Sequence, residues 1–224
     1  MKETDFARYL TQFLGVYLPG HLGSKKNTQL SYRDSFSLLL EYCRDEEKIA
    51  PEKLMVSQVD RDLILRFLKW LEEVRSCKTT TRNQRLAAIH SFFSFLMVEA
   101  PQYIEQSQKV LNIPMKKADK PPLMYLPLDS VKGLLDQPDR TTTQGRRDAV
   151  LLSLLYDTGA RAQELVDLKV CDINLNDKVT VILTGKGGKS RIVPVMAPTG
   201  ELLRQYIDGA GLSHPSKSRT PLFT

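Results

Sequence analysis

The chain has 224 residues, of which 42% are hydrophobic and 26% are charged. These proportions are typical of folded globular proteins and exclude a chain that is disordered throughout. A run of about 18 uncharged apolar residues, which a membrane-spanning helix needs, does not occur. The first residues do not resemble a secretory signal, so we expect a cytoplasmic protein without a membrane partner.

The net charge is +6 at pH 7, and the pI is about 9.2. The surplus lies late in the chain, because residues 1–105 hold 15 Lys and Arg against 14 Asp and Glu, whereas residues 106–224 hold 17 against 12. This modest excess favours a polyanionic partner without requiring one. The three cysteines are scattered and lack a CxxC spacing, so we expect no disulfide and no metal site.

Apolar residues repeat at helical spacing through the first hundred residues. The pattern predicts four helices around one core, and we take residues 1–105 as a compact helical domain. The four expected helices are residues 6–17, ended by Pro19-Gly20; a helix capped by Thr28; one from about Asp60; and one from Thr79 or Thr80 to Pro101.

The composition changes after this domain. Residues 106–127 hold four prolines and several lysines, which predicts an extended interdomain linker. Residues 128–224 predict a mixed α/β domain that is mostly helical and carries a small antiparallel hairpin. Its expected elements are helices 128–135, 147–156, 162–168 and one beginning at 201, and strands 179–183 and 191–195.

A candidate anion site lies in residues 154–168, which read LLYDTGARAQELVDL. A helix ends at Gly159, and the turn presents Arg161 where the next helix begins. An arginine beside the backbone N–H groups of a helix start suits a phosphate. Glu164 follows on the same helix face, where it would hold the guanidinium or a backbone donor. A surface Arg–Glu pair is the simpler interpretation from spacing alone.

The segment 184–191, TGKGGKSR, resembles the end of a nucleotide-binding P-loop. That interpretation fails because Leu183 stands where the motif needs its first glycine, and a strand follows where a helix should begin. A hairpin tip that carries Lys186, Lys189 and Arg191 better suits a basic finger that reaches nucleic acid. An ordinary glycine-rich hairpin with solvated lysines remains the alternative.

The ordered set of motifs resembles the tyrosine recombinases, the phage integrase and Xer-like enzymes. The set comprises KKNTQLSYRDSF at 25–36, TTTRNQRLAAIHSFFSFL at 79–96, GRRD at 145–148, LLYDTGARAQEL from 154, CDINL, and VTVILTGKGGKSRIVPV. The resemblance implies a mainly α protein, with a four-helix SAM-like core-binding domain followed by part of a mixed α/β catalytic domain. It also implies DNA cleavage through a 3′-phosphotyrosyl intermediate that needs no cofactor.

The resemblance implies roles for particular residues. Arg161 would contact the scissile phosphate, Lys186 would be the general acid, and Glu164 would support the arginine. Lys189 is a second candidate for the lysine role. The family's His-x-x-Arg motif and its tyrosine nucleophile are expected after position 224, so we expect this chain alone not to cleave DNA. A half catalytic domain should also expose apolar surface, which predicts self-association or disorder of the last residues.

Two polar clusters stand at expected helix starts of the first domain, and in this family such clusters would contact duplex DNA, mostly at phosphates. Capped and solvated helix ends are the alternative. The full-length protein is expected to assemble as a homo-oligomer on DNA. Two further functions remain open: a non-catalytic regulator of recombination, and a degenerate protein-interaction remnant. The expected DNA contacts are Lys25, Lys26, Asn27, Thr28, Tyr32, Lys78, Thr80, Arg82, Arg85, Lys189 and Arg191.

Overall fold

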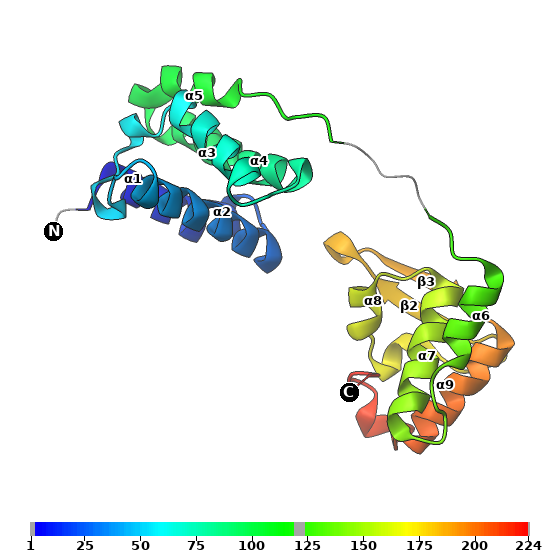
Figure 1. Ribbon diagram of the computed structural model, residues 1–224. Coiled ribbons are helices and arrows are strands. Elements are labelled where there is room, and N and C mark those ends of the chain that lie inside the picture. The colour runs from blue at the N-terminus through cyan, green and yellow to red at the C-terminus, as the bar shows by residue number, and fades with distance from the viewer. Residues whose placement is uncertain (1–2, 119–123, 224) are drawn as a thin grey trace. The chain divides into compact units, whose positions relative to one another are not determined.

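The computed structural model describes residues 3–118 and 124–223, without the Lys186 side chain. The chain divides into two compact units, residues 1–121 and 122–224, each with its own core (Figure 1). Both are mostly helical, and the small sheet belongs to the second, as the sequence predicts. Within the described ranges, no helix is both long and apolar enough to cross a membrane.

The first unit is a helical bundle built around aromatic residues. Phe13 is fully buried and packs edge-on against Phe36 and Phe92, with ring centroids 6.1 and 5.4 Å apart. Burial of each such side chain contributes about 1.5–3 kcal/mol. The main helices are α1 (Asp5–Gln12), the π-helix η1 (Phe13–His21), α2 (Lys26–Asp45), α3 (Arg61–Glu73), α4 (Thr79–Glu99) and α5 (Ile104–Leu111).

Several sequence predictions for this unit need correction. The first helix does not end at Pro19, because the chain continues through that residue as a π-helix to His21. Thr28 is not a cap but lies inside α2, whose N-cap is Lys25. Asp60 does cap α3, since its carboxylate accepts from the Leu63 N–H.

Helix α5 extends the first domain into the predicted linker. It packs on α4 and buries Val110, and Ile113 is buried just beyond it. His90 on α4 is half-buried against this helix, with its Nε2 3.1 Å from the Val110 carbonyl oxygen. The helical unit therefore holds one helix more than predicted among its described residues, and its fold reaches past residue 105.

The second unit packs helices against one face of an antiparallel sheet with strand order β1-β2-β3. Pairs Val181–Val193 and Leu183–Arg191 share a sheet face with alternate residues, and the side chains of Val181 and Leu183 are buried there. The elements are α6 (Leu128–Asp136), α7 (Thr143–Thr158), α8 (Ala162–Val166), β1 (Ile173–Asn174), β2 (Thr180–Thr184), β3 (Ser190–Pro194) and α9 (Ala197–Gly209).

The last described residues close onto the core of the second unit. Leu222 is fully buried, and its backbone N–H donates to the Leu168 carbonyl. Tyr206 packs inward, and its hydroxyl donates to the Leu222 carbonyl over 3.0 Å. Tyr156 on α7 is, by contrast, 49% exposed.

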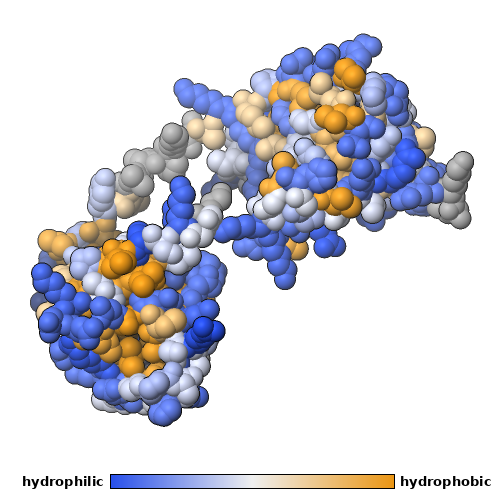
Figure 2. Space-filling model, turned by 180° about the vertical axis from the view of Figure 1, so that it is seen from behind, coloured by the Kyte–Doolittle hydropathy of each residue, from blue (hydrophilic) through white to orange (hydrophobic). Residues whose placement is uncertain are grey.

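Apolar surface is visible on the second unit. Figure 2 shows hydrophobic residues over much of the face of this unit that is turned toward the viewer. Its exposed apolar side chains include Ile182 and Ile192, which are paired across β2 and β3 on the sheet face that the helices do not cover. Exposed apolar patches commonly mark interaction surfaces.

Candidate functional site

The turn between α7 and α8 positions Arg161 at the start of α8. Gly159 ends α7 with φ of 57°, a left-handed conformation that glycine adopts without strain. Arg161 follows as the N-cap of α8, and its side chain is 74% exposed. The left-handed turn at Gly159 and the N-cap position together leave the Arg161 guanidinium exposed to solvent.

Glu164 anchors this arginine from within α8. Its carboxylate accepts from the Arg161 backbone N–H over 3.1 Å and from the Arg161 Nη1 over 2.8 Å. The Glu164 side chain is only 4% exposed. The sequence predicted that Glu164 holds the guanidinium or a backbone donor, and in the structure its carboxylate accepts from both.

A second arginine completes the group, which we call the Glu164 clamp (Arg161, Glu164 and Arg191). Arg191 reaches from β3, and its Nη2 and Nη1 lie 2.7 and 3.3 Å from the two Glu164 oxygens. It was predicted to contact DNA, but both of these nitrogens are directed at Glu164. The clamp therefore ties the hairpin to the start of α8.

The hydrogen bonds lower the pKa of the Glu164 carboxyl from 4.5 to about 2, with the bond from Arg191 as the largest cause and the Arg161 backbone N–H next. The carboxylate is therefore ionised at neutral pH. A Cβ atom at Gly185 would lie 2.8 Å from the Glu164 Oε1. The first glycine of the hairpin loop thus makes room for the clamp.

The hairpin tip carries the remaining lysines. Residues Lys186–Gly188 form a 3-10 turn in which Gly187 has φ of 85°. The predicted general acid role of Lys186 concerns a side chain outside the described part of the structure. Lys189 is exposed, and its backbone carbonyl accepts from the Gly185 N–H over 2.9 Å.

The two polar clusters of the first unit lie at the same end of the bundle. Ser31 on α2 meets Gln84 and Arg85 on α4, and both helices begin five residues before this contact. Further along, Phe36 meets Phe92, so the two helices run in the same direction. We call this surface the basic end; its exposed residues are Lys25, Lys26, Asn27, Thr28, Lys78 and Thr80.

Both helices begin at this end without a side-chain cap. Lys25 and Lys78 are their N-cap residues, and in the described part of the unit no side chain accepts from the first-turn N–H groups there. Such N–H groups carry partial positive charge. A lysine beside uncapped N–H groups suits an oxygen anion at each start.

Three predicted DNA contacts have other roles in the structure. Arg82 is 4% exposed and donates to the Pro114 carbonyl, so its burial argues against a phosphate contact. Arg85 donates to the Ser31 carbonyl and the Ser35 hydroxyl, which joins α4 to α2. The half-buried ring of Tyr32 stacks on Phe13 with centroids 6.2 Å apart. Each of these side chains makes contacts within the first unit that stabilise the bundle.

Residues 114–116 of the predicted linker lie beside the basic end. The Asn83 side chain on α4 donates to the Lys116 carbonyl over 2.7 Å and accepts from the Lys116 N–H over 3.1 Å. The Lys116 ammonium pairs with Glu72 over 2.6 Å. The chain is therefore fixed to the bundle as far as residue 116, a restraint that no sequence signal indicated.

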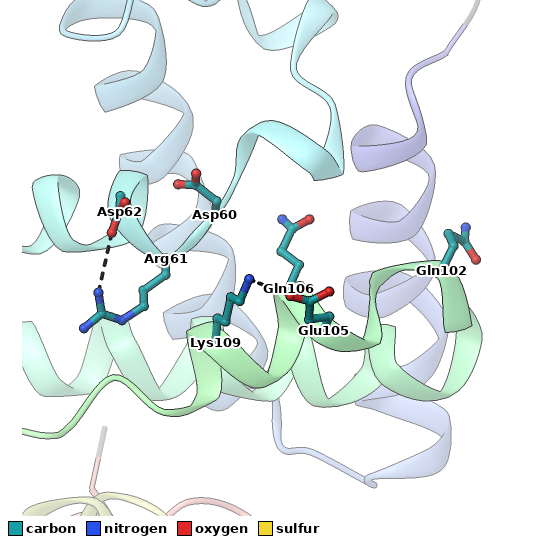
Figure 3. Close-up of a pocket in the computed structure, with 7 residues that line it drawn as sticks. All are labelled: Asp60, Arg61, Asp62, Gln102, Glu105, Gln106 and Lys109. Atoms are coloured by element: carbon teal, nitrogen blue, oxygen red, sulfur yellow. Dashed lines mark ion pairs between the residues drawn. The ribbon is translucent and has the colours of Figure 1, made fainter.

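A groove of about 520 Å³ lies elsewhere on the first unit, between the start of α3 and α5 (Figure 3). It is lined by side chains of both charges. Arg61 pairs with Asp62 and Lys109 pairs with Glu105, so these charges are compensated locally. None of the predicted DNA contacts lines this groove.

Both units match models of known protein families. Residues 10–100 match the family model of the phage integrase N-terminal SAM-like domain, and residues 124–223 match that of the phage integrase family. Sinorhizobium fredii has two similar proteins, the putative integrase/recombinases y4rC and y4rD. Both are 34% identical over 92% of this chain, which covers 62% and 75% of them, respectively. Tyrosine recombinase XerD of Pseudomonas putida is 32% identical over 82% of this chain and 58% of its own length.

Solved structures show the same fold. The XerH site-specific recombinase bound to its difH substrate aligns with a TM-score of 0.62 at 22% identity, over 88% of this chain and 55% of that one. The Tn1549 transposon integrase in complex with transposon right end DNA aligns with a TM-score of 0.67 at 15% identity, over 96% and 69%.

The helical unit thus matches the SAM-like domain and the mixed unit matches the integrase domain, in the order of the two family models. The chain belongs to the phage integrase family, the tyrosine recombinases. It spans roughly three fifths of the length of y4rC and of XerD.

Proposed function

We propose that this chain binds duplex DNA as part of a tyrosine recombinase, with one contact surface on each unit. The main support for the proposal is the environment of Arg161. Its side chain is largely exposed, yet the buried Glu164 carboxylate holds it beside a basic hairpin. Such an arginine is pre-oriented for a phosphate, because its position is fixed before the ligand arrives.

On the first unit, the basic end supplies the proposed contacts. Lysines and uncapped first-turn N–H groups at two helix starts can bind neighbouring backbone phosphates. Asn27, Thr28 and Thr80 add exposed hydrogen-bonding side chains. On the second unit, Lys189 of the hairpin is the matching proposed contact.

For the chemistry, we assign Arg161 to charge stabilisation on the scissile phosphate and Lys186 to proton donation to the leaving 5′-oxygen in a complete recombinase. Glu164 supports Arg161 and carries no proton, because its pKa of about 2 keeps it ionised. The nucleophile would attack phosphorus and form a 3′-phosphotyrosyl bond, which conserves the phosphodiester energy without a cofactor.

A polypeptide of these 224 residues is proposed to bind DNA without cleaving it. None of its three histidines is followed by arginine at the third position. Tyr206 is buried and donates to a backbone carbonyl, which is unsuited to attack on phosphorus. Tyr156 is exposed, but its hydroxyl has no described hydrogen bond to a base that would activate it.

The test is a titration of a duplex of unrelated sequence at several salt concentrations, with a pool of nicked, sequence-randomised duplexes to trap covalent product. We expect log K to fall with log[salt], with a slope of about −0.9 for each phosphate contacted. Salt-sensitive binding without an adduct supports the proposal. An adduct would contradict the absence of cleavage, and loss of binding altogether would favour a protein-interaction remnant.

A regulator that occupies recombination sites without cutting is a second candidate, and it predicts the same binding curve. It differs in predicting that the chain, added in excess, inhibits a full-length relative on the same DNA. We also propose assembly of several copies on DNA. The exposed apolar surface of the second unit supports it, and sedimentation with and without duplex tests it.

A further inference from the structure

The register of the hairpin puts Arg191 on the helix-facing side of the sheet, where its side chain is 43% exposed. It pairs with Leu183 across β2 and β3, and the Leu183 side chain is buried on the helix-facing side of the sheet. Alternation along the strands puts both residues on that side. The Arg191 guanidinium therefore meets Glu164 on α8, with its Nη1 and Nη2 3.3 and 2.7 Å from the carboxylate oxygens.

The clamp contains two positive side chains and only one negative side chain. One carboxylate lies between two guanidinium groups, so the group carries a net charge of +1. The Arg161 side chain donates to Glu164 through Nη1 alone among its described contacts, whereas Arg191 uses two nitrogens. Without the second arginine, Glu164 would be free to pair fully with Arg161 and to cancel its charge.

We propose that Arg191 is a positioning residue that neutralises Glu164, so that Arg161 is oriented by the carboxylate yet keeps its positive charge for a DNA phosphate. This inference rests on the proposed DNA binding. Arg191 then acts through Glu164 and does not itself touch DNA. A direct phosphate contact by Arg191 is the competing explanation, and the two make opposite predictions when Glu164 is also changed.

The experiment measures duplex affinity and its salt dependence for the full chain in a double-mutant cycle. Arg191→Gln removes the charge but keeps hydrogen-bond donors, and Glu164→Gln removes the carboxylate charge. Arg191→Gln alone should weaken binding about tenfold and reduce the salt slope by about 0.9, because Arg161 is then neutralised. In the Glu164→Gln background the same change should cost no more than about twofold. Arg191→Lys, which keeps the charge, should bind within about twofold of the unchanged chain.

Lys189→Ala is the matched control, because Lys189 is a proposed direct contact on the same hairpin. Its loss of affinity should be the same with Glu164 or Gln at position 164. An Arg191→Gln defect that persists in the Glu164→Gln background overturns the inference and makes Arg191 a direct contact. Unchanged binding by Arg191→Gln overturns it as well.

A second measurement is independent of DNA and separates failure of the inference from failure of the proposed function. Rotation of the Arg161 guanidinium, followed by NMR, should slow in Arg191→Gln as the pair with Glu164 tightens, and should speed up again in the double variant. This result with no duplex binding by the unchanged chain would refute the DNA-binding proposal and leave the charge relationship standing. Unaltered rotation in Arg191→Gln overturns the inference.

Discussion

Asn83 pairs with Lys116 as a residue of a neighbouring β-strand would, because its side-chain amide donates to the Lys116 carbonyl and accepts from the Lys116 N–H. A helix residue thereby binds the backbone of a segment 33 positions later. The neighbouring Arg82 reinforces this contact by donating to the Pro114 carbonyl. The segment up to Lys116 is thus part of the first unit.

Asn83→Ala should destabilise the first unit by about 1–2 kcal/mol, since two hydrogen bonds to the Lys116 backbone are lost. Trp70 is the single tryptophan and belongs to this unit, so its fluorescence during urea unfolding reports the change. Asn27→Ala is the matched control, with a change of no more than about 0.5 kcal/mol. Equal stability losses in the two variants would contradict the role of Asn83.

Arg82 and Lys78 should show opposite defects. Arg82→Met leaves the Pro114 carbonyl without this donor and should cost about 2 kcal/mol of stability, with little change in the salt slope of DNA binding. Lys78→Ala should leave the Trp70 unfolding curve unchanged and reduce the slope by about 0.9. A reduced slope with full stability in Arg82→Met would restore Arg82 as a DNA contact.

Glu164 should make the second unit sensitive to acid. Its folded pKa of about 2 lies below the ordinary value of 4.5, so the clamp contributes stability that is present above pH 4.5 and is lost as the pH falls toward 2. Amide hydrogen exchange of strand β2, measured from pH 5 to pH 2.5, should report this loss. Glu164→Gln should flatten the pH dependence, and an unchanged profile would count against the assigned pKa.

Two glycines of the second unit should respond to alanine in opposite directions. Gly159 has φ of 57° at the end of α7, so Gly159→Ala should cost about 1 kcal/mol. Gly133 lies inside α6 with open space around its Cα, so Gly133→Ala should stabilise that helix by up to about 1 kcal/mol. Thermal unfolding followed by far-UV circular dichroism compares the two variants. Melting temperatures that shift in the same direction would contradict the different roles of Gly159 and Gly133.

A polypeptide cut at the boundary predicted from sequence should be less stable than one that keeps α5. Ending at residue 105 removes Val110 from the core and removes Gln106, whose amide donates to the Val56 and Val59 carbonyls. Residues 3–118 should unfold cooperatively by Trp70 fluorescence, and residues 3–105 should lose several kcal/mol. Equal midpoints would show that α5 is dispensable.

The sequence predicted the elements with strong local signals. The β-branched runs gave the hairpin, and Asp60 and Thr79 marked helix starts that the structure confirms. Helix α5 was missed because its few apolar positions stand between polar residues and a proline-rich stretch. The burial of Arg82 was not foreseen, because two arginines near a helix start carry no local sign of which one is buried.

Arg191 is an intermediate case. Alternation along β3 puts it on the same face as Val193, which hints at an inward direction. The partner that it finds there, Glu164, is 27 residues away, and only tertiary packing brings the two together. The family resemblance supplied the expected roles of Arg161 and Glu164. The pairing of Arg191 with Glu164 is known only from the structure.

The anchoring of Lys116 also sets a length. A linker of residues 106–127 could span about 80 Å when fully extended, but eleven residues between Lys116 and Leu128 can span only about 40 Å. The tether starts beside the basic end of the first unit. If both units bind one duplex as proposed, their points of attachment to the tether lie within that reach of each other, and a shorter tether raises the local concentration of the second unit once the first is bound.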